Sequence, residues 1–84
     1  NNNLCLKMPN GLNNWTFKDV EAVLKENGFQ VNHTRGSHYY YRASVAGKLR
    51  QVCVPRHGNK LSFNPRTLKS IVAQSGLAKT AWGL

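Results

Sequence analysis

The chain has 84 residues, enough for one domain with a thin core, which excludes a deep cavity for a large cofactor or small-molecule substrate. Twelve Lys and Arg residues stand against three acids, so the net charge is +9 and the pI is near 10.2. This balance favours a polyanion bound at the surface, above all nucleic acid, with solubility alone as the alternative. A membrane surface is disfavoured, because no segment is long, amphipathic and apolar enough.

Residues 1–15 are rich in asparagine and are interrupted by Pro9 and Gly11. This composition predicts a flexible or loosely docked arm, with Trp15 fixing its end to the domain. The chain begins without methionine, and Met8 is one candidate for a native start.

A first helix is predicted from Thr16, which is a good N-cap and has Asp19 three residues later as an imperfect capping box. The apolar residues that follow recur at helical spacing and predict one buried face: Phe17, Val20, Val23 and Leu24. Asn27-Gly28 ends this helix, because glycine readily adopts the left-handed conformation of a C-terminal cap.

Three strands are predicted next, over residues 29–34, 38–43 and 49–54. Turns at residues 35–37 and 44–48 join them, and Pro55 ends the third because it cannot continue a ladder of hydrogen bonds. Short turns between strands indicate an antiparallel meander.

Residues 55–63 form a basic loop, and Asn64-Pro65 starts a second helix that Gly76 ends. We therefore expect an α+β fold, with the α-β-β-β-α order of double-stranded-RNA-binding domains. Its three-stranded antiparallel sheet would carry both helices on one face and leave the other free for a ligand. We place this domain at residues 16–78 and a short tail at 79–84, with Trp82 packed against the domain.

Cysteine usage gives no sign of a metal site or a disulfide scaffold. Cys5 and Cys53 are far apart, and the CxxC, HxxxH and HExxH spacings typical of zinc sites are absent. Cys53 lies between two valines, which favours a small buried apolar residue. No signal peptide or membrane-spanning run is visible, so we expect a reducing, cytoplasmic location.

Two segments carry a family resemblance. Residues 28–41 read GFQVNHTRGSHYYY, and residues 52–77 read VCVPRHGNKLSFNPRTLKSIVAQSGL. The motifs of these segments, in their order, resemble the HicA family of messenger-RNA interferases. They are the GF pair, the GSH triplet with its tyrosine-rich strand, the VP.H motif and TL.SI. The loop NKLSFNP departs from the family pattern, which more often has a charged KEL and glycine there.

The resemblance implies an endoribonuclease toxin of a bacterial type II toxin–antitoxin system, which cleaves mRNA without a metal or other cofactor. It also implies a HicB-like antitoxin as partner, and its catalytic histidine matches His38. The chemistry of the residue agrees, since RNA carries its own nucleophile, the 2′-OH. A histidine, whose ordinary pKa is near neutral, can remove the proton of that hydroxyl. The alternative is that His38 only begins a strand and bonds locally.

Other residues are candidates for RNA contacts around His38: Arg35, Ser37, Tyr40, Arg56, His57, Lys60 and Arg66. Arg35 would hold the phosphate, and Tyr40 would offer a face for a base if His38 faces solvent. Ser37 would contact phosphate or only form the turn. His57 would be the acid partner of His38, or a loop residue that binds phosphate. His33 is expected to be a packed or rim residue.

Two other functions fit the same pattern. One is a non-catalytic module that binds duplex RNA by shape, although Arg66 and Lys69 form only a thin basic cluster at the last helix. The other is a purely protein-binding role, with the basic face matched to an acidic antitoxin.

Overall fold

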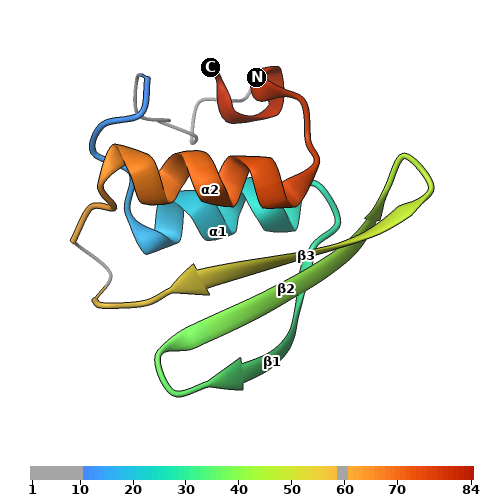
Figure 1. The fold of residues 1–84 in the computed structure, drawn as a ribbon, viewed down its shortest axis with the longest axis horizontal. Coiled ribbons are helices and arrows are strands. Elements are labelled where there is room, and N and C mark those ends of the chain that lie inside the picture. Colours follow the sequence, from blue (N-terminus) through green and yellow to red (C-terminus); the bar gives the residue numbers. More distant parts are fainter. Residues whose placement is uncertain (1–10, 59–60) are drawn as a thin grey trace.

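The protein folds as a helix, three antiparallel strands and a second helix (Figure 1). The computed structural model describes residues 11–58 and 61–84. Its elements are α1 (Phe17–Glu26), β1 (Gln30–Arg35), β2 (His38–Val45), β3 (Lys48–Pro55), α2 (Pro65–Ser75) and a short 3-10 helix, η2 (Lys79–Trp82). The strand order is β1-β2-β3, so β2 is central. The predicted α-β-β-β-α fold is confirmed, and predicted strand ends differ from the observed ones by at most two residues.

The start of α1 is fixed by a complete capping box. The Thr16 hydroxyl accepts a hydrogen bond from the Asp19 backbone N–H at 3.4 Å, and the Asp19 carboxylate accepts one from the Thr16 N–H at 2.9 Å. Asp19 thus accepts the hydrogen bond that a longer Glu side chain usually accepts in a capping box. After Asn27, Gly28 has a φ of 89°, so the left-handed turn predicted at the helix end is present.

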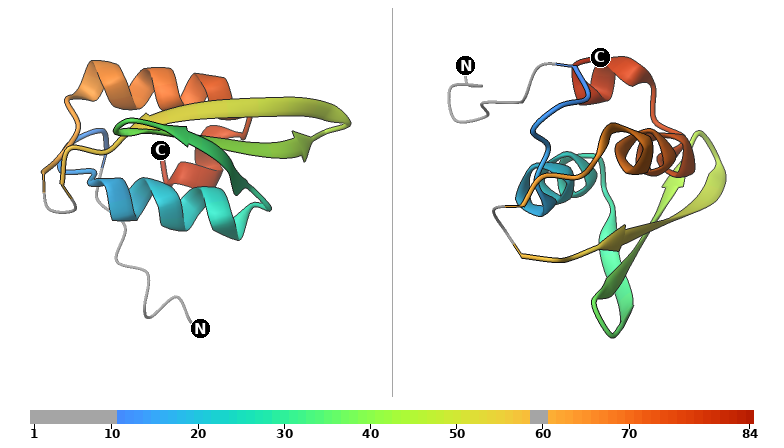
Figure 2. Two further views of the ribbon diagram at one scale, coloured as in Figure 1. Left: turned by 90° about the horizontal axis from the view of Figure 1, so that it is seen from below. Right: turned by 60° about the vertical axis from the view of Figure 1, so that its left-hand side comes forward.

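Both helices cover one face of the sheet, and the other face is open (Figures 1 and 2). The core lies between these layers and is formed by Trp15, Phe17, Val20, Val23, Leu24, Phe29, Tyr41, Val52, Val54, Leu68, Ile71, Val72 and Trp82. Trp15 and Trp82 meet edge to face, with 5.6 Å between ring centroids. The core therefore uses a tryptophan from before α1 and another from after α2.

The sequence predicted that Cys53 is buried, and this prediction is wrong. Val52 and Val54 are fully buried against the helices, so strand alternation turns Cys53 toward the open face, where it is half-buried. Two flanking valines indicate the opposite face for the residue between them, and the prediction overlooked this alternation.

Two-residue turns set the register of the hairpins. Arg35 pairs with His38 across Gly36-Ser37, where Gly36 alone has a positive φ, as in type II′ turns. Val45 pairs with Lys48 across Ala46-Gly47, where both residues have positive φ, as in type I′ turns.

Ala46 should therefore be a point where the fold can be stabilised. Alanine is unfavourable at its φ of 52°, whereas asparagine is common there in type I′ turns. We expect Ala46→Asn to raise the free energy of unfolding by about 0.5–1 kcal/mol, seen as a Tm increase of roughly 2–8 °C. Ala46→Val should lower the Tm, because a branched side chain resists this conformation. An unchanged Tm in both variants would contradict the assigned turn.

Candidate functional site

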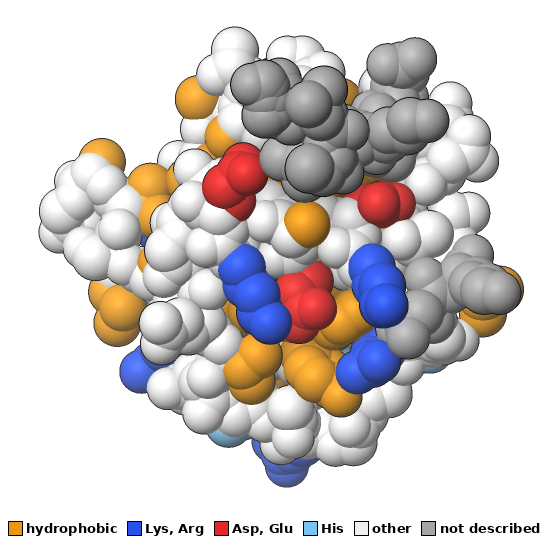
Figure 3. Space-filling view, turned by 180° about the vertical axis from the view of Figure 1, so that it is seen from behind, with side chains coloured by type: hydrophobic (Ala, Val, Ile, Leu, Met, Phe, Trp, Pro, Cys, Tyr) orange, Lys and Arg blue, Asp and Glu red, His pale blue; other side chains and the backbone are white. Residues whose placement is uncertain are grey.

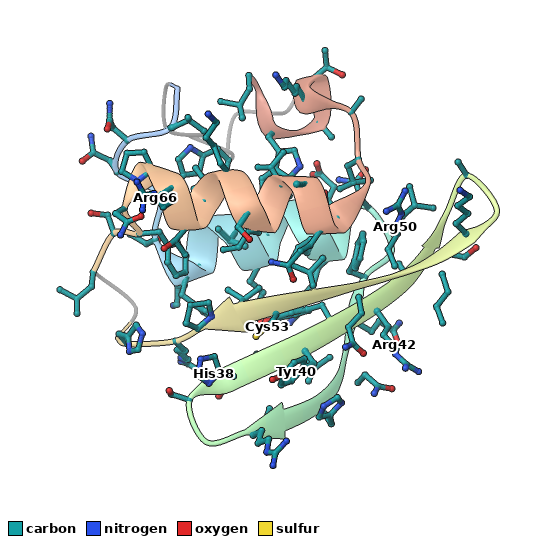
Figure 4. All side chains as sticks on the ribbon, in the orientation of Figure 1. His38, Tyr40, Arg42, Arg50, Cys53 and Arg66 are labelled. Atoms are coloured by element: carbon teal, nitrogen blue, oxygen red, sulfur yellow. The ribbon has the colours of Figure 1, made fainter. Side chains whose placement is uncertain are left out.

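The two faces of β2 carry different chemistry. Tyr39 and Tyr41 point toward the helices: the Tyr39 ring meets Phe17 edge to face at 5.2 Å, and the Tyr41 hydroxyl donates to Glu21 at 2.6 Å. Burial, followed by the bond to Glu21, raises the pKa of Tyr41. The alternate residues His38, Tyr40 and Arg42 lie along the other side of β2, on the open face (Figure 4).

His38 is the first residue of β2 and is exposed. It pairs with Arg35 of β1 on one side and Pro55 of β3 on the other. The Ser37 carbonyl accepts a 2.7 Å hydrogen bond from the Arg56 backbone N–H, which ties the turn before His38 to the segment after β3. His38 thus combines solvent access with a backbone held from both neighbouring strands.

Tyr40 is stacked on His33, its partner across the β1–β2 pair. The ring centroids are 4.4 Å apart and the planes differ by 8°. On the β3 side Tyr40 pairs with Cys53, and a hydrogen bond with that side chain is the main cause that raises the pKa of Tyr40. The Asn32 side-chain nitrogen lies 2.9 Å from His33 Nδ1. The exposed His33 is thus on the rim of the sheet, one of the two positions expected for it.

Arg56 lies on the helix side of the sheet. Its guanidinium is 4.9 Å from the Phe17 ring centroid and 5.4 Å from that of Tyr39, and Nη1 donates to the Tyr39 hydroxyl at 3.0 Å. The structure therefore gives this cation aromatic contacts that the sequence did not reveal.

The other predicted contact residues are spread over the molecule. Ser37 and His57 are exposed at the same end of the sheet as His38. Ser37 is in the β1–β2 turn, and His57 lies two residues after Pro55, the last residue of β3. Arg66 is exposed in the first turn of α2, in the helix layer (Figure 4). Lys60 lies outside the described residues.

The acids are confined to one side of the molecule. The three acids of the sequence, Asp19, Glu21 and Glu26, all belong to α1, and Figure 3 shows acidic side chains on this side of the molecule. The open face of the sheet has Arg35 and Arg42 and no acid. A polyanion therefore meets no carboxylate on that face.

One pair of residues on the open face was missed from the sequence. Arg42 Nε donates to Gln51 Oε1 at 3.0 Å, and these residues are opposite each other on β2 and β3. The spacing of two residues from Tyr40 and four from His38 was a signal that Arg42 shares their face.

Within the described segments, no three His, Cys, Asp or Glu side chains form a group that could hold a metal ion. Across residues 11–58 and 61–84, no helix has the length and apolar character needed to cross a bilayer.

Fold and site together define a small basic α-β-β-β-α domain with a histidine on an open, acid-free sheet face. Residues 17–77 match the sequence model of the HicA toxin of bacterial toxin–antitoxin systems. The chain therefore belongs to the HicA toxin family, as the motifs predicted. Comparisons with curated proteins and with solved structures gave no match.

The contacts of Arg56 predict a role in stability. We expect Arg56→Gln to lower the free energy of unfolding by about 1 kcal/mol, because the variant loses a cation above two aromatic rings and a hydrogen bond to Tyr39. Arg66→Gln removes the same charge from an exposed site and should change stability by less than about 0.5 kcal/mol. Denaturant unfolding measures both, and equal losses would contradict the structural role of Arg56.

Proposed function

We propose that this toxin is an endoribonuclease that cleaves mRNA with His38 as general base. The observation that carries the proposal is the position of His38, exposed at the start of the central strand, opposite Arg35 and on a face without acids. A histidine held by packing would be buried or bonded within the core, and His38 is neither.

The proposed reaction uses groups that the RNA and the chain provide. His38 takes the proton of a ribose 2′-OH, and the 2′ oxygen attacks the adjacent phosphorus. The bond from phosphorus to the 5′ oxygen breaks, a proton from an acid or from water goes to that oxygen, and a 2′,3′-cyclic phosphate remains. Arg35 and Ser37 stabilise the charge that develops on the phosphate oxygens. No metal or other cofactor enters this path.

An antitoxin partner follows from the family, and we propose that it is HicB-like and acts by covering this site in the cytoplasm. An acidic surface on the antitoxin would complement the open face, where Arg35 and Arg42 lie without acids. Salt should then weaken the complex mainly through its association rate.

His38→Ala should abolish toxicity without unfolding the protein. We expect the cleavage rate of single-stranded RNA to fall by about 10²–10⁴-fold, the usual contribution of a general acid or base. Parent and variant would each be induced in a bacterial host, with growth and mRNA integrity followed and folding checked by circular dichroism. A DNA strand of the same sequence should stay intact, because it lacks the 2′-OH.

The outcomes separate the alternatives. If the parent stops growth and cuts RNA while the folded variant does neither, the mechanism stands. If both proteins are harmless, a non-catalytic RNA-binding module is the better description. If both are equally toxic, or DNA is cut as well, His38 is not the catalytic base.

His57→Gln tests the second histidine. Because His57 is exposed at the same end of the sheet, we propose that it contacts phosphate. The variant should therefore raise KM and lower kcat by less than about tenfold, whereas loss of a general acid would lower kcat by about 10²-fold or more. Steady-state cleavage of a short labelled RNA measures both constants. A loss of kcat as large as that of His38→Ala would instead make His57 the general acid.

A further inference from the structure

We infer that the open face binds a single RNA strand along β2, with the His33–Tyr40 stack as a platform for a base and Arg42 as a further phosphate contact. The inference rests on the proposed function, which places the cleaved phosphate at His38. It adds a path for the substrate along β2 and assigns roles to His33, Arg42 and Gln51.

The row of side chains on β2 has a spacing suited to an extended strand. His38, Tyr40 and Arg42 follow one another on the same side of β2 (Figure 4). Alternate residues of a strand are about 6.6–6.8 Å apart, which is comparable to the step between nucleotides of a stretched RNA chain. One nucleotide can therefore meet each of these side chains in turn.

The His33–Tyr40 stack provides an aromatic surface at the sheet edge. His33 covers Tyr40 on the β1 side, and β1 is an edge strand, so the outer side of the exposed His33 ring is open to a base. The Asn32 side-chain nitrogen, 2.9 Å from His33 Nδ1, helps to hold the orientation of this ring. A base stacked on such a pre-formed pair binds without ordering a new side chain.

Arg42 is held in a position to bind phosphate. Its Nε–H is occupied by Gln51 at 3.0 Å, and this bond orients the planar guanidinium. The two terminal nitrogens remain to grip a phosphate through paired hydrogen bonds. Gln51 acts through Arg42 and is thus a positioning residue.

These contacts favour a single strand over a duplex. Bases in a duplex are stacked on each other, so they cannot stack on His33, whereas unpaired bases can. An aromatic ring next to a cation, as with Tyr40 and Arg42, is also typical of surfaces that bind one strand.

The test measures binding separately from cleavage. His38→Ala protein, which should not cut its ligand, is titrated into a fluorescein-labelled single-stranded RNA of mixed sequence. We add Arg42→Gln or His33→Ala to this background, and Lys18→Gln as a control that removes the same charge from an exposed position on α1. Circular dichroism confirms that each variant is folded.

Arg42→Gln and His33→Ala should each weaken binding by about fivefold or more, whereas Lys18→Gln should change it by less than twofold. Arg42→Gln should also change how strongly binding depends on salt. The slope of log K against log salt concentration should become less steep by about 0.7, the value for one phosphate contact on a single strand. Gln51→Leu should weaken binding with Arg42 present and have no further effect in Arg42→Gln, as expected for a positioning residue. A duplex of the same sequence should compete poorly.

The inference is overturned if the His38→Ala protein does not bind the single strand, if Lys18→Gln weakens binding as much as Arg42→Gln, or if the duplex competes equally. Its failure differs from failure of the proposed function. If the parent cuts RNA but Arg42→Gln and His33→Ala keep the parental KM, only the RNA path is wrong. If binding follows the expected pattern but the parent does not cut RNA, only the catalytic proposal is wrong.

Discussion

The alternation of side chains along β2 is the constraint on which both the core and the site depend. Tyr41 is buried and bonded to Glu21, and this fixes the face that its strand turns toward the helices. His38 and Tyr40 must then face outward. A slip of one residue would bury the histidine and expose Tyr41, so the packing that stabilises the fold also maintains the site. The tight turn at Gly36 prevents such a slip, because it joins the paired residues Arg35 and His38 directly.

Two of the three acids of this basic chain have structural uses. Asp19 caps α1, and Glu21 accepts from Tyr41 and lies 3.5 Å from Lys25. These contacts hold both carboxylates on α1, on the side of the sheet away from the open face. The open face is thus free of carboxylates that would repel a polyanion, and its attraction for a polyanion is stronger at low salt.

The sequence predicted the order and the ends of the elements well, because local signals determine them. Thr16, Gly28 and Asn64 mark helix ends through caps that involve near neighbours. Periodicity also showed that His38 and Tyr40 share a face. It could not show which face is buried, since that depends on helices that pack from distant parts of the chain.

The pairs on the open face could not be predicted for the same physical reason. His33 meets Tyr40 through the β1–β2 register that runs back from the Arg35–His38 pair at the turn, and Arg42 meets Gln51 through the β2–β3 register. Such pairs depend on register, which the sequence of a single strand does not contain. The contacts of Arg56 could not be predicted either, because the two aromatic rings that it meets belong to α1 and β2. These rings make the Arg56 side chain part of the packing.

A chain of this length gains from placing its site on the face that the core does not use. Side chains that stabilise the fold alternate along β2 and β3 with side chains that meet solvent, so a change at His38 or Arg42 leaves the packing at Tyr41, Val52 and Val54 intact. A site inside the thin core would lose that independence, because each polar group there would replace apolar contacts. The sheet therefore allows a small protein to carry chemistry without reducing the burial that keeps it folded.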